Sequence, residues 1–349
     1  MGMVTQKTRG ELIRNLFPEL PDYRFRQTEE AVFHAGWKSW NDVSNLPGEA
    51  RAKLAAEVPW TSWTAADLHR SAAGDTFKTI LGLPDGNRIE TVLMKNSRGQ
   101  WTVCVSSQVG CAMKCAFCAT GTMGLLRNLT SDEIVDQVRY WLDFVASPEG
   151  PGSRISNIVF MGMGEPLANY ENVKESIRTV LKRTDIGLTR ITVSTSGMLP
   201  QLEALLLDQD WPDVRLAVSL HSADAKTRAQ IMPSSYEGFL ERLKNWALKY
   251  LAAKGGGRRH LTFEHIMLGN VNDSPEHAAK LADFAKSIGD VRVNLIPYNR
   301  TDAGFAVTPD ARIRAFMDVL ERNGITVTRR KSQGDDIAAA CGQLVVRKS

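Results

Sequence analysis

One short stretch of the chain reads Cys111-Ala-Met-Lys-Cys115-Ala-Phe-Cys118 and spaces three thiols as C-x3-C-x2-C. Gly110 precedes the stretch and Gly121 follows it, so we predict a compact loop and not a long helix. Three thiolates on one loop can reach three corners of one inorganic cluster. If that cluster is a 4Fe–4S cube, its fourth iron stays open. An open iron beside a small-molecule site is typical of a catalytic centre more than of an electron store.

The composition limits the class of protein. A chain of 349 residues with 43% hydrophobic and 23% charged residues is typical of a globular protein of about two domains. It has no apolar run of ~18 residues and no signal peptide, so we expect a cytoplasmic protein without membrane contact. Three of its five cysteines are clustered, which favours metal binding or catalysis over a disulfide framework. A net charge of +4 does not by itself indicate nucleic acid.

Residues 1–75 are predicted to form a small helical accessory domain. One helix is expected over Tyr23–Trp37 and another over Ala50–Glu57. Basic and aromatic residues interleave in this region, and two interpretations stay open. They contact RNA through phosphates and stacked bases, or they form a tryptophan-rich core with solvated charges. The residues concerned are Arg24, Arg26, Trp37, Trp40, Trp60 and Trp63.

The rest of the chain predicts an α/β fold. Residues 76–100 have the pattern of a β-hairpin extension, and residues 101–330 alternate strands with helices. The helix that follows the cysteine stretch begins at a capping box, Thr130-x-x-Glu133. About six βα units predict an incomplete (β/α)6 barrel with parallel strands. Residues 331–349 form a C-terminal tail.

Glycine-rich or polar segments follow several predicted strands. They are Met161–Pro166 (MGMGEP), Ser194–Gly197, Ser219–Ser222 and Ile296–Asn299. In a barrel of parallel strands, ligands gather at the carboxyl ends of the strands. We therefore expect these segments and the cysteine loop to share one rim and to form one site.

The cysteine spacing, with Phe117 before the last thiol, resembles the radical S-adenosylmethionine (SAM) superfamily. Within it, four segments resemble the RlmN family of dual-specificity RNA methyltransferases, which act on adenosine C2, and the similarity runs over essentially the whole chain. The segments are Cys104–Cys111 (CVSSQVGC), Met161–Pro166, Ser219–His221 (SLH) and Asp335–Leu344 (DDIAAACGQL).

The resemblance implies a set of ligands and partners. A 4Fe–4S cluster and SAM are expected as cofactors, with 23S rRNA (at the peptidyl transferase centre) and tRNA (next to the anticodon) as substrates. A flavodoxin or ferredoxin is expected as electron donor, and the chain as a monomer. The cluster ligands would be Cys111, Cys115 and Cys118, and the SAM contacts Gly164, Glu165, Ser196, Ser219, Leu220, His221 and Asn299.

The resemblance also implies a mechanism that uses two SAM molecules per turnover. Adenine C2 lies between two ring nitrogens and is no nucleophile, so direct attack on the SAM methyl group is implausible. Cys341 would take a methyl group from one SAM, and a 5′-deoxyadenosyl radical from a second SAM would remove a hydrogen from it. The resulting methylene radical would add to C2. Glu90 would then accept the C2 proton, and Cys104 would form a disulfide with Cys341 and release the product.

Other assignments of function remain open. The sister activity, of the Cfr type, methylates C8 of an adenosine in 23S rRNA with the same cysteines and glutamate. A non-enzyme alternative is a zinc-dependent RNA-binding module in which Cys104 joins the three clustered thiols.

Single residues also have plainer interpretations. Cys104 and Cys341 read singly as buried small hydrophobes, Glu90 as a solvated carboxylate and His221 as a core histidine. The basic segments 255–259 and 329–331 contact RNA phosphates or are solvated loops.

Overall fold

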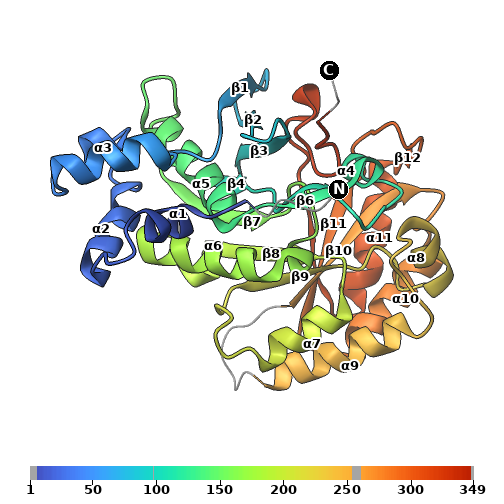
Figure 1. Cartoon of the computed structure of the whole chain (residues 1–349). Helices are drawn as coiled ribbons and strands as arrows, with labels where there is room; N and C mark the ends of the chain where they lie inside the picture. Colours follow the sequence, from blue (N-terminus) through green and yellow to red (C-terminus); the bar gives the residue numbers. More distant parts are fainter. Residues whose placement is uncertain (1–5, 97, 254–260, 347–349) are drawn as a thin grey trace.

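The computed structural model describes residues 6–96, 98–253 and 261–346 (Figure 1). Among these residues, no helix has both the length and the apolar character needed to cross a membrane. The strands are β1 (Ala65–Arg70), β2 (Thr76–Gly82), β3 (Arg88–Lys95), β4 (Trp101–Cys104), β5 (Gln108–Cys111), β6 (Gly124–Asn128), β7 (Ile155–Phe160), β8 (Ile191–Thr195), β9 (Arg215–Ser219), β10 (Leu261–Gly269), β11 (Val291–Pro297), β12 (Ala306–Val307) and β13 (Thr326–Arg329). The α-helices are α1 (Arg9–Leu16), α2 (Asp22–Ala31), α3 (Gly48–Glu57), α4 (Ala119–Met123), α5 (Ser131–Ala146), α6 (Tyr170–Arg183), α7 (Leu199–Leu207), α8 (Ala225–Ile231), α9 (Phe239–Ala252), α10 (Pro275–Lys286) and α11 (Asp310–Arg322).

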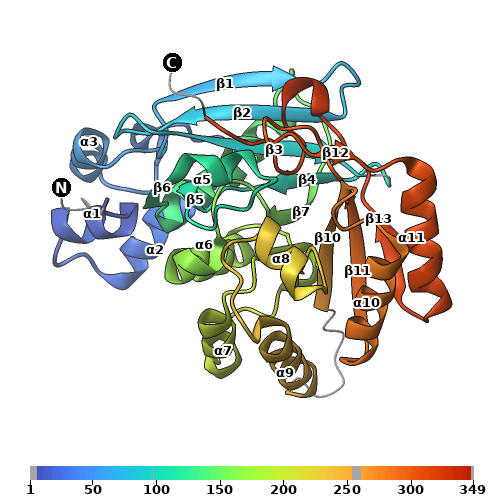
Figure 2. The ribbon, with the colours of Figure 1, turned by 90° about the vertical axis from the view of Figure 1, so that its right-hand side faces the viewer.

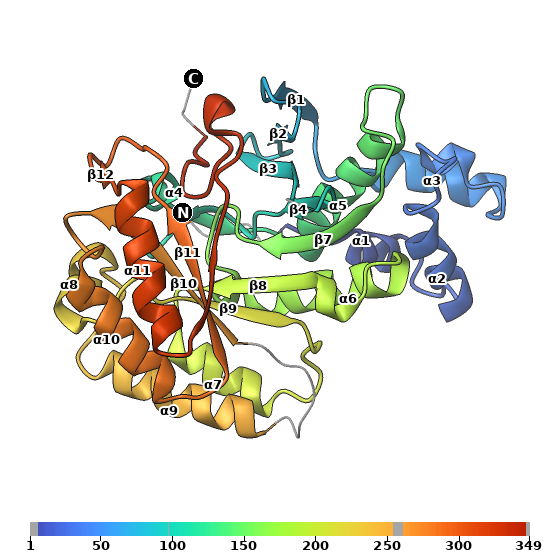
Figure 3. The ribbon, with the colours of Figure 1, turned by 180° about the vertical axis from the view of Figure 1, so that it is seen from behind.

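One continuous sheet organises the molecule, in the order β1-β2-β3-β4-β7-β8-β9-β10-β11-β13. Strands β1 to β4 pair antiparallel, and the strands from β4 to β13 pair parallel. Helices α6, α7, α9, α10 and α11 lie along the outside of the curved parallel part, as Figures 1 and 3 show. The predicted incomplete α/β barrel, with a helical N-terminal region and an antiparallel hairpin, is confirmed.

The sequence pattern predicted most barrel elements and missed several strands near the site. The capping box at Thr130 and Glu133 starts α5 as expected. Helix α2 ends at Ala31 and not at Trp37, because the chain turns there and His34 stacks on Trp37 at 4.0 Å between ring centroids. Strand β1 lies within the segment predicted to be helical. Its side chains are nearly all exposed at the edge of the sheet, so it lacks the alternating pattern of a half-buried strand.

The tryptophans of the N-terminal region mainly form a core. Trp40 is buried, donates its indole N–H to the Val58 carbonyl at 2.7 Å and packs edge-on against Trp60. This small cluster also contains Ile13 and Leu54. The packing accounts for Trp40 and Trp60 without an RNA contact. The division of the chain at residues 75, 100 and 330 stays a prediction.

A buried ionic network attaches the N-terminal helices to the barrel. Asp136 on α5 is fully buried and lies 2.5 Å from the guanidinium groups of both Arg9 and Arg139. Arg139 also donates to the carbonyls of Val32 and Trp60. One carboxylate therefore neutralises two buried cations that come from different parts of the chain, and their burial makes the pairing obligatory.

We expect Asp136→Asn to lower the free energy of unfolding by about 3–5 kcal/mol, because it removes the carboxylate paired with buried Arg139 and leaves buried Arg9 with Asp132 alone, at 3.5 Å. Urea unfolding of the cluster-free protein measures the loss. The matched control is Glu49→Gln, which removes one partner of the exposed Lys53–Glu49 pair on α3 and should change stability little. An Asp136→Asn protein as stable as the control would contradict this account of the attachment.

Candidate active site

The carboxyl ends of the parallel strands meet at a pocket of about 890 Å³. Figure 2 looks toward this end of the barrel, with α8 and the β5–β6 pair beside it. Most of the residues predicted to hold the cluster and SAM line this one pocket, as expected if the strand ends and the cysteine loop share one rim. They are Cys111, Cys115, Cys118, Gly164, Glu165, Ser196, Ser219 and His221.

The cysteine loop is held by backbone contacts on both sides. Strand β5 ends at Cys111 and pairs with β6, so that Cys111 faces Gly124. At Gly110, φ is +78° and a Cβ atom would lie 1.9 Å from the Gly124 carbonyl oxygen, so only glycine fits there. Farther along, the amide of Ala116 donates to Ile231 at the end of α8, and the amide of Ala119 donates to Gly342 in the tail.

The three thiols suit an iron–sulfur cluster better than a single ion. Burial raises the pKa of Cys111 to about 11; burial and then the neighbouring thiols raise that of Cys115. A metal must therefore displace their protons when it binds. Within the described chain, no three His, Cys, Asp or Glu side chains are close enough to hold one metal ion. Cys104, the fourth ligand of the zinc alternative, lines a different pocket.

Glu165 and Gly164 lie at the end of β7. The Glu165 carboxylate accepts hydrogen bonds from the amides of Leu167 and Ser196, and its own amide donates to the Gln108 side chain at 2.8 Å. Burial raises the pKa of Glu165. At Gly164, φ is +102° and a Cβ atom would lie 2.6 Å from Cβ of Gln108. The backbone can pass so close to Gln108 on β5 only because residue 164 is glycine.

A buried arginine that the sequence did not reveal organises the next two strand ends. Arg228 on α8 donates to the carbonyls of Ser196 and Leu220 at 2.8 and 3.1 Å and stacks on the Phe239 ring. Burial lowers its pKa to about 10. The Leu220 side chain is buried in the main core and does not line the pocket, so only its backbone is at the site.

His221 lies at the pocket and also has a hydrogen bond typical of a core histidine. It lines the pocket, and its Nδ1 accepts a hydrogen bond from the Ile266 amide at 3.1 Å, as a core histidine would. Burial, the nearby His265 and the cation of Arg228 lower its pKa well below the usual value. Its φ of +56° is rare for a residue other than glycine. Because its pKa is lowered, the imidazole is neutral at neutral pH. The rings of His221 and Phe117 pack at nearly a right angle to each other.

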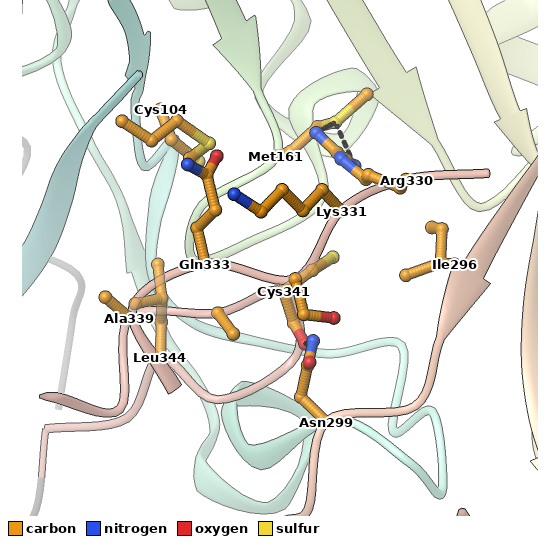
Figure 4. Close-up of a pocket in the computed structure, with 13 residues that line it drawn as sticks. Cys104, Met161, Ile296, Asn299, Arg330, Lys331, Gln333, Ala339, Cys341 and Leu344 are labelled. Atoms are coloured by element: carbon orange, nitrogen blue, oxygen red, sulfur yellow. Dashed lines mark hydrogen bonds between the residues drawn. The ribbon is translucent and has the colours of Figure 1, made fainter. Parts of the chain in front are cut away.

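A second pocket, of about 520 Å³, contains both accessory cysteines (Figure 4). Cys104 at the end of β4 and Cys341 in the tail line it together with Asn299, whose amide donates to the Cys341 carbonyl at 3.1 Å. Both cysteines are free thiols, so the disulfide implied for one stage of the reaction is not formed here. Burial raises the pKa of Cys104 to about 12 and raises that of Cys341. Cys341 lines the first pocket as well, and so connects the two.

The basic run 329–331 is not simply a solvated loop. Arg329 pairs with Asp310 at 2.6 Å, whereas Arg330 lines both pockets and donates to the thioether of Met161 at 3.2 Å. Its positive charge acts to lower the pKa of Cys104 and of Cys341. Lys331 lines the second pocket. The other basic segment, 255–259, lies outside the described residues.

Glu90 lies apart from both pockets of the thiols. It is buried on β3, pairs with Lys78 at 2.9 Å and lines a third, open pocket of about 1030 Å³. It is therefore not the solvated strand carboxylate considered above. Basic side chains border this third pocket, among them Arg88 and Arg300.

Ser106 connects the segments that carry these groups. Its hydroxyl donates to the Glu90 carbonyl at 2.6 Å and accepts from the Met163 amide at 2.8 Å. The hairpin, the end of β4 and the segment that leads to Glu165 therefore meet at one side chain. Glu264, which the sequence analysis also missed, lines the first pocket and accepts from Asn294 on the next strand.

Comparisons with known proteins agree with this geometry. A model of the radical SAM superfamily matches residues 105–282. The "Probable dual-specificity RNA methyltransferase RlmN" of Deinococcus deserti is 40% identical over 97% of both chains. The "Ribosomal RNA large subunit methyltransferase Cfr" of Lachnoclostridium phytofermentans is 36% identical over 100% of this chain and 99% of its own. The crystal structure of a radical SAM methyltransferase from Sphaerobacter thermophilus superposes with a TM-score of 0.87, at 39% identity over 97% of each chain.

We expect Arg228→Met to raise the dissociation constant for SAM about tenfold or more. Buried hydrogen bonds from a charged donor contribute ~1.5–3 kcal/mol each, and their loss releases the backbone at Ser196 and Leu220. Equilibrium dialysis on the anaerobically reconstituted protein measures the affinity. The control is Arg242→Met, which removes an exposed guanidinium near Tyr236. Equal affinities in the two variants would show that Arg228 does not organise the site.

Proposed function

The chain belongs to the RlmN family of radical SAM RNA methyltransferases, and on that premise we propose that it methylates C2 of an adenosine in 23S rRNA and in tRNA. The observation that supports a methyl-carrier reaction is the position of Cys341. Its side chain lines the pocket of the three clustered thiols and also the pocket of Cys104. A thiol in this position can accept a methyl group on one side and meet a second thiol on the other.

The residues at the rim fit the cofactors of the superfamily. Cys111, Cys115 and Cys118 would hold a 4Fe–4S cluster, and the strand ends would hold SAM through Gly164, Glu165, Ser196, Ser219, the Leu220 backbone and His221. Asn299 lies instead beside Cys341 and donates to its backbone carbonyl, so its contact in this structure is with the tail. When bound, the cluster and SAM supply a low-potential electron and an organic radical.

The chain's own part of the reaction begins at Cys341 Sγ, which gives up its proton to solvent and accepts a methyl group from SAM by displacement, with S-adenosylhomocysteine as the leaving group. After a hydrogen is removed from this S-methyl group, its carbon adds to adenine C2 and links protein and RNA. Glu90 would take the C2 proton, and the one electron that the radical adduct gives up would pass to the cluster that Cys111, Cys115 and Cys118 would hold. Cys104 Sγ then attacks Cys341 Sγ, the S–C bond breaks, and the bridging carbon takes up a proton to become the new methyl group. A thiol reductant restores the two free thiols.

Both proposed nucleophiles are thiols whose pKa is raised by burial, so each has to lose its proton before it reacts. The Arg330 cation opposes the effect of burial on the pKa of both thiols and so favours the thiolate forms. The basic residues around the third pocket suit an RNA backbone next to Glu90. The donor of low-potential electrons is a flavodoxin or a ferredoxin, and two SAM molecules are used per turnover.

The position of the new methyl group tests the proposal directly. We expect mass spectrometry of nucleosides from RNA treated with the purified protein, SAM and a reductant to give 2-methyladenosine from both 23S rRNA and tRNA. An 8-methyl product from rRNA alone would assign the chain to the sister activity. A colourless zinc protein that methylates neither RNA would support the binding module and end the proposal.

Substitution of each accessory cysteine should stop the reaction at a different stage. We expect Cys104→Ala to accumulate a covalent protein–RNA adduct, because the thiol that releases the product is missing. Cys341→Ala should form no adduct and no S-methylcysteine, because the methyl acceptor is missing. Denaturing gels with labelled RNA and peptide mass spectrometry measure the two species. Normal turnover by Cys341→Ala would rule out the methyl carrier.

A further inference from the structure

The tail lies between the thiol pocket and the pocket of Glu90. Ala339, Ala340, Cys341 and Leu344 line the pocket that contains Cys104. Ala338, Gln343, Val345 and Val346 line the pocket that contains Glu90. Figures 1 and 3 show this C-terminal segment beside β3 and α4. The loop that carries Cys341, residues 338–345, therefore lies between the pocket of Cys104 and the pocket of Glu90 and contributes side chains to both.

One buried ion pair holds both ends of this loop. Lys78 on β2 and Glu90 on β3 pair at 2.9 Å, and their side chains are 9% and 2% exposed. The Lys78 ammonium also donates to the Ala338 carbonyl at 3.2 Å, three residues before Cys341. The other Glu90 oxygen accepts from the Val345 amide at 2.8 Å, four residues after Cys341.

The conformation of the loop requires an anchor at Ala338. This residue has φ of +50° and ψ of +43°, the left-handed region that favours glycine over alanine. Such a conformation persists only where the surroundings hold it. The hydrogen bond from Lys78 to the carbonyl of this same residue contributes to this, together with the bonds that the amides of Ala338 and Ala339 donate to the carbonyls of Asp335 and Gly334. Other contacts fix neighbouring points of the tail, such as Asp336, which accepts from the Ala72 amide, and Leu344, which accepts from Thr120.

The register of the hairpin brings Lys78 and Glu90 together. Ile80 faces Glu90 and Lys78 faces Val92, so that Lys78 is the diagonal neighbour of Glu90 on the same face of the sheet. Val92 in turn faces Cys104 on β4. The anchor of the loop, the proposed proton acceptor and the thiol that releases the product therefore belong to three adjacent strands.

We propose that Lys78 is a positioning residue, which holds the Cys341 loop at Ala338 and orients the Glu90 carboxylate at the opposite side of that loop. The inference deepens the proposed function and rests on it, since it takes Cys341 as methyl carrier and Glu90 as proton acceptor. In this arrangement, one ammonium fixes the position of the Cys341 loop relative to the Glu90 carboxylate. Both groups act at adenine C2 in the proposed reaction. Removal of the ammonium releases both groups together.

Hydrogen–deuterium exchange of the cluster-free protein tests the anchoring without any turnover. We expect Lys78→Met to increase exchange in residues 338–345 and Lys78→Arg to restore protection. The matched control is Lys95→Met on the same hairpin, where the ammonium lies over the Trp101 ring at 5.8 Å from its centroid. Adding Ala338→Gly to Lys78→Met should recover part of the protection, because glycine adopts the left-handed conformation without the anchor. Unchanged exchange in Lys78→Met would overturn the proposal.

Turnover by the reconstituted enzyme separates positioning from a general structural role. We expect Lys78→Met to lower kcat about 100-fold, because a catalytic group displaced by about 1 Å loses activity on that scale. The KM for SAM should stay unchanged. The protein–RNA adduct should accumulate, because Glu90 no longer takes the C2 proton efficiently. A rise in KM with no adduct would indicate general disruption and overturn the proposal. Should Lys78→Met fail to fold, Lys78→Gln keeps a donor for Ala338 but removes the positive charge beside Glu90. It should exchange like the wild type in residues 338–345 and still have a lower kcat, and a wild-type kcat would overturn the proposal.

The proposed function can fail independently. If Cys104→Ala forms no adduct with RNA, the methyl-carrier reaction is wrong, whatever Lys78 does. If Cys104→Ala forms the adduct while Lys78→Met exchanges and turns over like the wild type, only the role of Lys78 is wrong.

Discussion

The hydroxyl of Ser106 is the point on which the site depends. It lies at the junction of an antiparallel hairpin and a parallel barrel, two parts of a sheet with different geometry, and bonds to the backbone of Glu90 and of Met163. A larger or apolar side chain there would leave buried backbone groups without partners and move the two parts relative to each other. The cysteine loop, the proposed SAM pocket and the proposed proton acceptor share this junction. A shift at Ser106 would therefore displace all three.

The two thiol pockets would keep the two proposed thiol reactions apart. In the proposed reaction, Cys341 accepts a methyl group from SAM and Cys104 releases the product, and Cys104 would compete for the same methyl group if it lined the first pocket. Among the five cysteines, only Cys341 lines both spaces. It shares this position with Arg330 and with Ile296 on β11, so the two pockets adjoin along the end of the barrel.

Local patterns in the sequence predicted most of the barrel and the rim, and contacts between distant residues escaped prediction. The capping box at Thr130 and the cysteine loop are short-range signals, and parallel strands bring their carboxyl ends to one rim whatever the detailed packing. Arg228 gave no signal in the local sequence, since its burial depends on two strand ends that only the fold brings together. Glu90 was identified by resemblance, but its partner Lys78 was not, because that pairing depends on strand register.

The length of the β2–β3 turn is also constrained by the chemistry. Lys78 and Glu90 share a face only because Ile80 pairs with Glu90 across the hairpin. The side chains of a strand alternate between faces, so a slip of the pairing by one residue turns one of the two away while leaving the sheet hydrogen-bonded. Insertions or deletions between residues 83 and 87 are therefore tolerated during evolution only where they preserve this register, although the turn itself lies at the surface.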